Sequence, residues 1–375
     1  MLHRIYDDLN VLIRPKKALI IYGARRVGKT TLITHFLEKT NLRYKLDSGD
    51  NIRTQETLGS RDFTKILDYI SGYELIVIDE AQEIPHIGTA LKIIVDQSPD
   101  TTVIATGSSS FELAQQIGEP LTGRKISAIL FPLSQKELSH YYNRHELHEK
   151  LEEFLIFGTY PEVLTAENRR EKIRILQELV DSYLLKDILS HDRIKSPKTL
   201  LQLLKLLAFQ IGNEVSLNEL ANNLGIDVKT VARYLDLLEK TFVVKRLGGF
   251  RRNLRKEVTA KAKYCFLDNG VRNGIISQMN PLEDRNDHGA LFENFVLMER
   301  IKKHTYEDYY GNFYFWRTYD GQEIDLVEEI DGKLDGFELK WSESKKPKIP
   351  KDWTRHYGDA SHTVIHRENY LDFVL

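Results

Sequence analysis

A glycine-rich stretch near the start of the sequence has the residue types and spacing of a phosphate-binding loop. Gly23 and Gly28 bracket four residues and are followed by Lys29 and Thr30, which is the Walker A pattern. Glycines let the backbone approach an anion closely, and the loop N–H groups with the positive end of a following helix bind its charge. The lysine would reach the β- and γ-phosphates, and the hydroxyl would bind Mg²⁺. The residues expected to hold the nucleotide are Gly23, Ala24, Arg25, Arg26, Val27, Gly28, Lys29, Thr30 and Thr31.

Two adjacent carboxylates, Asp79 and Glu80, close an apolar run at residues 75–78. An apolar run of this length is typical of a parallel strand that is buried on both faces. We expect Asp79 to hold the Mg²⁺ water shell and Glu80 to polarise the attacking water. The alternative is a helix N-cap with an acidic first turn, which leaves the pairing with a phosphate-binding loop unexplained.

Two later positions are candidates for the same chemistry. Ser108 ends a predicted buried strand at residues 101–108 that closes in small polar residues, and it would sense the γ-phosphate or the water if that strand neighbours Asp79. Arg124 follows a glycine turn and is a candidate arginine finger, acting in cis or from a neighbouring subunit. The alternatives are a plain strand-to-helix turn for Ser108 and a solvated or ion-paired side chain for Arg124.

The elements that must position these residues alternate between strand and helix. Strand-like runs end near residues 22, 47, 79 and 107, and helical patterns separate them. This alternation predicts an α/β fold with a parallel sheet and right-handed crossovers. Ligands of such sheets lie at the carboxyl ends of the strands, where the candidate residues are.

Five motifs occur in an order that resembles the prokaryotic AAA-type P-loop ATPases with a conserved, poorly characterised C-terminal region. They lie at residues 23–30, 78–82, 106–109, 121–124 and 131–134, and later stretches at 157–162, 183–188 and 263–268 fit the same family. The resemblance covers nearly the whole chain. It implies an AAA-type core that hydrolyses ATP with Mg²⁺, whereas the later motifs name no activity.

The middle of the sequence predicts helices and then a winged helix. Residues 136–195 carry apolar residues at three- and four-residue spacing, as a helical lid or linker would. From 196 to 262, two helices separated by a turn at Gly225 precede a hairpin with a basic tip, and the second helix would face the major groove. From Lys245 to Lys263 only Glu257 opposes eight lysines and arginines.

A basic patch of this kind suits contacts with DNA phosphates. The expected DNA-binding residues are Lys229, Arg233, Arg251, Arg252, Arg255 and Lys256. The alternative is a winged helix that binds only proteins, with the charge run as a solvated face.

The C-terminal region predicts a hairpin that carries a second cluster of acids. Asp331-Gly332 favours a two-residue type I′ turn, and this fixes Asp325 opposite Glu338 with Lys340 on the same face. We expect Ile324, Leu326, Phe337 and Leu339 on the other face. A Mg²⁺ ion between Asp325 and Glu338 could activate water for phosphodiester cleavage, with Lys340 stabilising the developing charge.

This Asp…Glu-x-Lys arrangement resembles the PD-(D/E)XK nuclease core. The resemblance implies a further acid on a preceding helix, and Glu293 lies where that helix should be. Ile324 stands where the pattern usually has proline. One alternative is a degenerate nuclease fold that does not cleave DNA. The other is that these charged residues form the solvent-exposed face of the hairpin and pair with each other.

The composition of the chain limits the classes of protein to which it can belong. The chain of 375 residues has a net charge of −2, so nucleic-acid binding must come from local patches. The single cysteine excludes a disulfide framework and favours a reducing cytoplasm, and the sequence has no apolar run of membrane-spanning length. The predicted domains are 1–135 (ATPase core), 136–195 (lid), 196–262 (winged helix) and 263–375 (nuclease-like).

These features favour an ATPase that couples nucleotide turnover to DNA processing by remodelling, branch migration, unwinding or cleavage. The alternative is a nucleotide-switched regulatory protein, with a protein-recruiting winged helix and a silent nuclease fold. An NTP-driven toxin or defence protein is compatible but has no dedicated sequence support. A finger supplied by Arg124 in trans would require a homo-oligomer.

Overall fold

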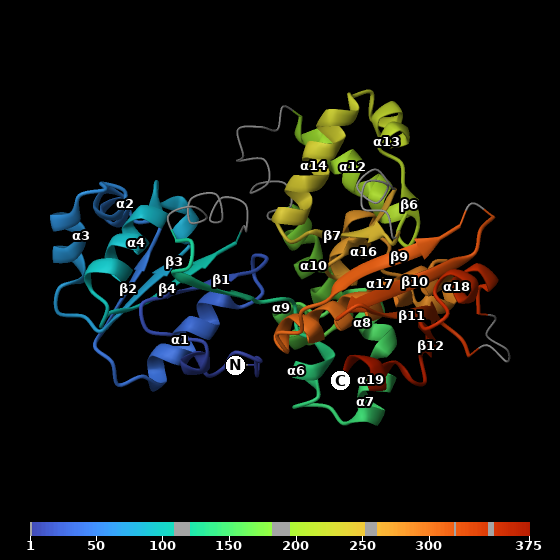
Figure 1. The fold of residues 1–375 in the computed structure, drawn as a ribbon, viewed down its shortest axis with the longest axis horizontal. Helices are drawn as coiled ribbons and strands as arrows, with labels where there is room; N and C mark the ends of the chain where they lie inside the picture. Colours follow the sequence, from blue (N-terminus) through green and yellow to red (C-terminus); the bar gives the residue numbers. More distant parts are fainter. Residues whose placement is uncertain (1, 109–120, 182–195, 252–260, 319, 344–348) are drawn as a thin grey trace. The chain divides into compact units, whose positions relative to one another are not determined.

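The structure is a computed structural model that describes residues 2–108, 121–181, 196–251, 261–318, 320–343 and 349–375 (Figure 1). The chain divides into two compact units. The first comprises residues 1–131 with 240–242, and the second comprises 132–239 with 243–375. Among the described residues, no helix combines the length and apolar character needed to cross a membrane.

The first unit is built on a sheet of five parallel strands in the order β2-β3-β4-β1-β5. The strands are β1 (Ala18–Tyr22), β2 (Tyr44–Ser48), β3 (Leu75–Asp79), β4 (Thr102–Gly107) and β5 (Lys125–Ile129). The predicted α/β architecture with a parallel sheet is confirmed. Strand β4 lies between β1 and β3, so the condition set for Ser108, a strand beside Asp79, is met.

Helices cover both faces of this sheet (Figure 1). They are α1 (Lys29–Lys39), α2 (Ile52–Leu58), α3 (Phe63–Ile70) and α4 (Ile87–Gln97), with short 3-10 turns at Leu9–Val11 and Ala81–Glu83. Alternate residues of β1, β3 and β4, such as Ile20 and Ile78, form one core with α2, α3 and α4. The right-handed crossover from β1 to β2 places α1 on the opposite face. Both faces are therefore buried, which is why these strands are apolar throughout.

The second unit begins with a run of short helices. They are α6 (Gln135–Leu138), α7 (Arg144–Glu149), α8 (Leu151–Phe157), α9 (Pro161–Thr165) and α10 (Arg169–Glu178). Three more helices follow, namely α12 (Pro197–Phe209), α13 (Leu217–Leu224) and α14 (Val228–Lys240). Gly225 ends α13 in the left-handed conformation with a φ of 64°, where the sequence predicted the turn.

A seven-stranded mixed sheet in the order β12-β11-β10-β9-β7-β8-β6 forms the centre of this unit. Its strands are β6 (Glu214–Val215), β7 (Val244–Gly249), β8 (Ala262–Phe266), β9 (Asn312–Arg317), β10 (Glu323–Ile330), β11 (Lys333–Lys340) and β12 (Ser361–His366). Strands β7 and β8 are antiparallel, as the predicted hairpin requires, and β7 also pairs with β9. One sheet therefore runs through the proposed boundary at residues 262/263, which falls inside β8.

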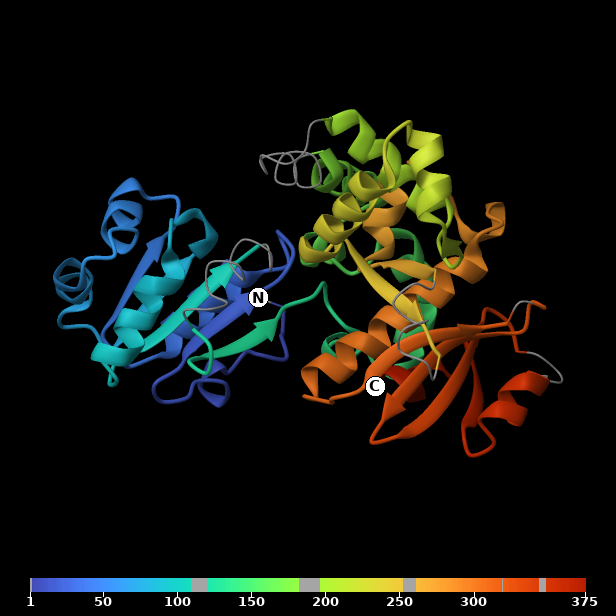
Figure 2. The same ribbon diagram turned by 45° about the horizontal axis from the view of Figure 1, so that its top comes forward.

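Helices lie on both faces of the β9–β12 strands, which are drawn in orange to red in Figure 2. Glu328 of β10 accepts hydrogen bonds from Arg300 of α17 (His288–Tyr306). The preceding Val327 packs with Trp353 of α18 (Lys351–His356). Because successive strand residues point to opposite faces, α17 and α18 cover different faces. The other helices of the residues that the structure describes are α16 (Asn269–Ile275), α19 (Tyr370–Val374) and a 3-10 turn at Leu282–Asp284.

The hairpin predicted at Asp331-Gly332 is confirmed. Both residues have positive φ values, 50° and 78°, and Ile330 pairs with Lys333 as expected for a type I′ turn. The prediction that successive side chains of β10 alternate between the two faces of the sheet is wrong at one point. The pairing of β10 with β9 shifts between Ile324 and Val327. This bulge turns Ile324 toward the face of Val327 and Trp353, away from its expected place beside Phe337.

Candidate functional site

The glycine loop at residues 23–28 joins β1 to α1 at the carboxyl end of the sheet. A Cβ atom at Gly23 would lie 2.2 Å from the carbonyl oxygen of Leu130, so only glycine fits there. Gly28 caps α1 with a φ of 98°, a conformation that glycine adopts without strain. Lys29 is buried, and its Nζ atom donates to the carbonyl oxygens of Gly23 at 2.8 Å and Ala24 at 3.0 Å. The lysine is thus held inside the loop.

The residues predicted to bind the Mg²⁺ shell lie directly against each other. The Thr30 hydroxyl donates to Asp79 Oδ2 at 2.7 Å, across the first turn of α1 and the end of β3. Asp79 Oδ1 in turn accepts from the Thr106 hydroxyl. Hard oxygen donors from two neighbouring strands and the loop helix therefore converge at one edge of the sheet, which is the donor set that a Mg²⁺–nucleotide site needs.

Glu80 follows Asp79 in the left-handed conformation, with a φ of 50°. Its N–H donates to Thr106 Oγ1 at 3.2 Å, and its Oε2 atom accepts from Gln82 Nε2 at 2.6 Å. The same Gln82 amide donates to Ser108 Oγ at 3.2 Å. Ser108 is therefore linked to Glu80 through Gln82, whereas the hydroxyl of β4 that contacts Asp79 is that of Thr106. The sequence placed this stretch correctly but did not single out Thr106 or Gln82.

Arg4 is a residue of this site that sequence reasoning missed. The residue is 3% exposed, and its guanidinium donates from Nη1 to the Val27 carbonyl at 2.5 Å and from Nη2 to the Phe131 carbonyl at 2.6 Å. Arg4 thereby ties the glycine loop to the segment that follows β5. An arginine four residues into the sequence, without a motif around it, carries no local signal for such a role.

Arg124 lies at the other end of the sheet. Lys125, the next residue, begins β5 and pairs with Ala18, the first residue of β1, whereas the glycine loop follows the last residue of β1. A strand of 5 residues spans roughly 16 Å. Arg124 Nε also donates to Asp96 Oδ1 at 2.5 Å. This position does not support a finger that acts in cis, and a role in trans remains a prediction.

The acids of the C-terminal region gather around two lysines. Lys340 Nζ lies 3.2 Å from Glu338 Oε1 and 3.6 Å from Asp325 Oδ2. Lys263 of β8, which the sequence counted in the basic patch, is 2% exposed, and its Nζ atom lies 2.9 Å from Glu293 Oε1. The four predicted residues are therefore brought together, with Lys263 added to them.

Burial has the largest effect on the pKa values of the carboxyl groups in this cluster. It raises the pKa of Glu293 to about 7 against the lowering effect of the Lys263 charge, and it raises the pKa of Asp325 against Lys263 and Lys340. Burial alone would lower the pKa of Lys263, but the charges of Glu293, Asp325 and Glu323 outweigh it and hold that pKa above its usual range. Lys263 is therefore a buried ammonium ion at neutral pH.

The cluster does not fit the predicted metal site. The oxygens of Asp325 face the two lysines, and Oδ2 also accepts the Leu339 N–H at 2.8 Å. Glu338 faces Lys340 and, at 3.8 Å, His362. Within the described part of the chain, no three His, Cys, Asp or Glu side chains are grouped as metal ligands. We therefore derive no metal-assisted step at Asp325 and Glu338.

Three of the predicted DNA-binding residues lie within the described part of the chain. Lys229 and Arg233 are exposed on α14, and Arg251 is half-buried just after β7. Arg252, Arg255 and Lys256 lie outside the described residues, as does the 183–188 motif. The burial of Lys263 removes one positive charge from the patch that the sequence analysis counted.

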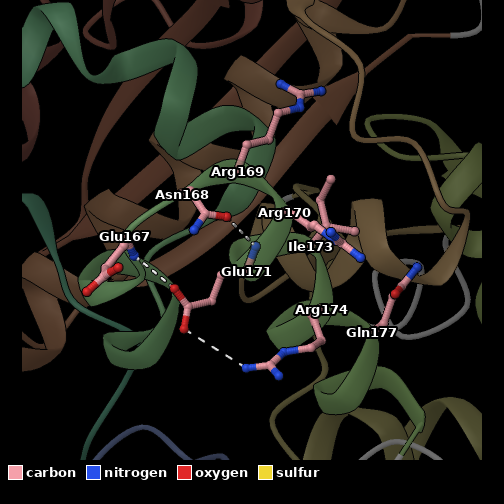
Figure 3. Close-up of a pocket in the computed structure, with 8 residues that line it drawn as sticks. All are labelled: Glu167, Asn168, Arg169, Arg170, Glu171, Ile173, Arg174 and Gln177. Carbon is pink, nitrogen blue, oxygen red and sulfur yellow. Dashed lines mark hydrogen bonds and ion pairs between the residues drawn. The ribbon is translucent and has the colours of Figure 1, made fainter.

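A cavity of about 930 Å³ lies along α10 (Figure 3). Its lining includes Arg169, Arg170 and Arg174 together with Glu167 and Glu171. Asn168 caps the helix by accepting the Glu171 N–H at 3.0 Å, and Arg169 donates to the Met279 carbonyl. Asn168 and Arg169 are thus engaged within the protein, and the cavity lining contains none of the predicted site residues.

Comparison with protein-family models finds three matches that divide the chain. Residues 15–139 match a model described as an AAA domain, which spans the glycine loop, Asp79 and Arg124. Residues 148–282 and 288–371 match two models described as domains of unknown function, DUF8612 and DUF4143. The N-terminal unit is thus similar to AAA domains in sequence, and the family models assign no activity to the remainder.

Relatives that match most of this chain in sequence occur in archaea and bacteria. An uncharacterized protein of Methanocaldococcus jannaschii is 24% identical over 345 residues, which covers 86% of this chain and 74% of that protein. An uncharacterized protein of Mycobacterium tuberculosis is 27% identical over 329 residues, covering 86% and 70%. One of Haemophilus influenzae is 26% identical over 308 residues, covering 76% and 74%.

Two solved structures resemble this chain distantly. The Thermotoga maritima RuvB Holliday junction branch migration motor has a TM-score of 0.28 at 18% identity, covering 61% of this chain and 82% of that chain. A structure of Pif1 helicases at forked double-stranded DNA has a TM-score of 0.23 at 13% identity, covering 48% and 52%. Similarity at this level carries no functional argument. The sequence match to an AAA domain is the finding that bears on function.

Proposed function

We propose that this chain is an ATPase that binds Mg²⁺–ATP at the carboxyl edge of the five-stranded sheet and couples its hydrolysis to DNA processing. The observation that carries the proposal is the 2.7 Å hydrogen bond between Thr30 of the glycine loop and Asp79 of the neighbouring strand. It places the two predicted Mg²⁺-shell residues together, beside a buried lysine. The match of residues 15–139 to an AAA domain supports the same assignment.

Each residue of the site has a chemical role that follows from its place. The loop N–H groups and the start of α1 receive the phosphates, and Lys29 leaves the Gly23 and Ala24 carbonyls to contact the β- and γ-phosphates. When bound, Mg²⁺ neutralises charge on the phosphate oxygens. Thr30 and Asp79 orient that ion's shell. Glu80, steadied by Gln82, orients the attacking water.

DNA is the proposed partner because of the elements around α14. Two helices joined at Gly225 are followed by an antiparallel strand pair, β7 and β8, which is the order of elements in a winged helix. Lys229 and Arg233 are exposed on α14, where a recognition helix would carry its phosphate contacts. Binding through such contacts weakens steeply as the salt concentration rises.

Phosphate release from ATP, measured with and without duplex, forked and single-stranded DNA, tests the proposal. We expect DNA to stimulate turnover, and we expect Lys29→Ala to abolish it. Glu80→Gln should lower kcat about 10²- to 10⁴-fold while nucleotide binding persists, because only the water-orienting group is lost. The exposed Glu83 supplies a matched control, Glu83→Gln, which should keep turnover near the wild-type rate.

The alternative is a nucleotide-switched regulatory protein, in which the winged helix recruits another protein. That protein would bind ATP at the same site but turn it over slowly, with no response to DNA. ATP binding with unstimulated turnover on every DNA substrate would therefore contradict the DNA-processing proposal and favour the switch.

A further inference from the structure

The carboxylates of the nuclease-like region surround a buried lysine from another part of the sheet. Lys263 Nζ lies 2.7 Å from Glu323 Oε1, 2.9 Å from Glu293 Oε1 and 3.8 Å from Asp325 Oδ1. These carboxylates come from α17 and β10, whereas Lys263 comes from β8. The lysine side chain is 2% exposed, so protein oxygens surround its ammonium group in place of water.

A second lysine completes the charge pattern. Lys340 Nζ contacts Asp325 and Glu338 and is 46% exposed, so it approaches the cluster from the solvent side. Asp325 therefore lies between the two ammonium groups and receives the Leu339 N–H as well. The carboxylates of this cluster therefore face two cations, Lys263 and Lys340, that are side chains of the same protein.

Buried carboxylates are costly unless a positive charge lies against them. A divalent metal ion can supply that charge, and so can an ammonium group held at hydrogen-bonding distance. Mg²⁺ needs its oxygen ligands at about 2.1 Å in octahedral geometry, with several waters retained. A metal ion bound among Glu293, Glu323 and Asp325 would lie against the Lys263 charge and would compete with it for the same oxygens.

We propose that Lys263 is the resident cation of the acid cluster formed by Glu293, Glu323 and Asp325, and that its ammonium group occupies the place a divalent metal ion would need to bind these carboxylates. The cluster then binds no divalent metal in the native protein and does not cleave DNA. The ion pairs of Lys263 instead hold β8, which pairs with β7, against α17 and β10. This inference does not depend on the ATP site.

Binding of Mn²⁺ to the full-length protein tests the assignment, with the signal of free Mn²⁺ in electron paramagnetic resonance as the readout and nucleotide absent. We expect Asp325→Asn to leave the Mn²⁺ binding of the wild-type chain unchanged. In Lys263→Ala the removed cation exposes the carboxylates, so we expect a new saturable Mn²⁺ site. The double variant Lys263→Ala/Asp325→Asn should lose that site. Any binding by Asp79 at the ATP site is common to all variants and cancels.

Matched controls separate the role of Lys263 from general effects of charge. Lys261 lies just before the same strand with its side chain 64% exposed, so Lys261→Ala should gain no Mn²⁺ site. Lys263→Arg keeps the charge and should also gain none. Mn²⁺ should shift the unfolding temperatures of both controls no more than that of the wild-type chain, whereas it should raise the unfolding temperature of Lys263→Ala further.

Two results would overturn the proposal. One is a wild-type Mn²⁺ site that Asp325→Asn or Glu293→Gln removes, or Mg²⁺-dependent cleavage of DNA that these variants abolish. The other is a folded Lys263→Ala protein that gains no Mn²⁺ site. If Lys263→Ala does not fold, the comparison of wild type with Asp325→Asn still decides, because a metal-holding cluster must lose Mn²⁺ on that substitution.

Discussion

The hydroxyl of Thr30 donates a hydrogen bond of 2.7 Å to the Oδ2 atom of Asp79. This bond joins the first turn of α1 to the end of β3, two segments that are 49 residues apart in the sequence. The same carboxylate accepts the Thr106 hydroxyl through Oδ1, so Asp79 is oriented from both sides. Two hydroxyl donors therefore fix the orientation of the Asp79 carboxylate.

Removal of the Thr30 hydroxyl should weaken the site without unfolding it. In Thr30→Ala the Asp79 carboxylate loses one orienting donor, and the Mg²⁺ shell loses a ligand, so we expect hydrolysis to fall about 10- to 100-fold. Thr30→Ser keeps the hydroxyl and should stay close to wild type. Phosphate release at varied Mg²⁺ concentration measures the effect, and equal rates for Thr30→Ala and Thr30→Ser would contradict it.

Loss of Arg4 should affect both the stability of the first unit and the use of ATP. Arg4→Ala leaves the buried carbonyls of Val27 and Phe131 without these donors, a loss that costs about 1.5–3 kcal/mol for a hydrogen bond to a charged group. Because Val27 belongs to the glycine loop, we also expect the KM for ATP to rise. Urea unfolding and steady-state hydrolysis are the measurements.

The exposed Arg14 provides the control for that experiment. Its guanidinium donates to the nearby carbonyls of Val11 and Ile13 at the surface, so Arg14→Ala should change neither stability nor KM appreciably. If Arg4→Ala were as stable as Arg14→Ala and bound ATP equally well, the assigned role of Arg4 in holding the loop would be refuted.

Because Arg124 lies at the amino end of β5 in its own chain, we predict that it acts as a finger for another subunit. We expect Lys29→Ala and Arg124→Ala proteins to be inactive alone and to regain part of their ATP turnover when mixed. Asp96→Asn breaks the ion pair with Arg124 but keeps the arginine, so it should remain active. Full activity of Arg124→Ala alone would show that the residue only pairs with Asp96.

The Asp287 carboxylate should contribute stability that depends on pH. Burial acts to raise its pKa, but hydrogen bonds from Arg285 and the charge of Arg272 outweigh this and lower the pKa to about 2. The folded state thus binds the proton more weakly than the unfolded chain does. The contribution is fully present above the ordinary pKa of Asp and is lost as the pH falls through about 2.

We therefore expect Asp287→Asn to lower the free energy of unfolding by about 2–3 kcal/mol at pH 7. The difference from wild type should stay constant down to pH 5 and shrink at pH 4 and pH 3. Urea unfolding at each pH measures it, with the exposed Asp284→Asn as control. A difference that is as large at pH 3 as at pH 7 would rule out the assigned ion pairs.

Local sequence was sufficient for the features whose causes are local. The strand, glycine loop and helix around Lys29 follow from an apolar run, two glycines and a helical pattern, all within residues 18–39. The Asp331-Gly332 turn follows from the need for two positive φ values, and the turn length then fixes the pairing of Ile330 with Lys333. The alternation of strands and helices likewise predicted the parallel sheet.

Tertiary structure decided the features that depend on which distant segments meet. Lys263 reads in sequence as one more charge in a basic stretch, and only the pairing of β8 within the seven-stranded sheet buries it among acids from α17 and β10. Arg4 and Thr106 acquire their roles through hydrogen bonds to residues 23 or more positions away. The bulge in β10 alters which face Ile324 occupies. A residue's charge and size are written in the sequence, but its partners are fixed by strand order, register and burial, and these arise only when the chain is folded.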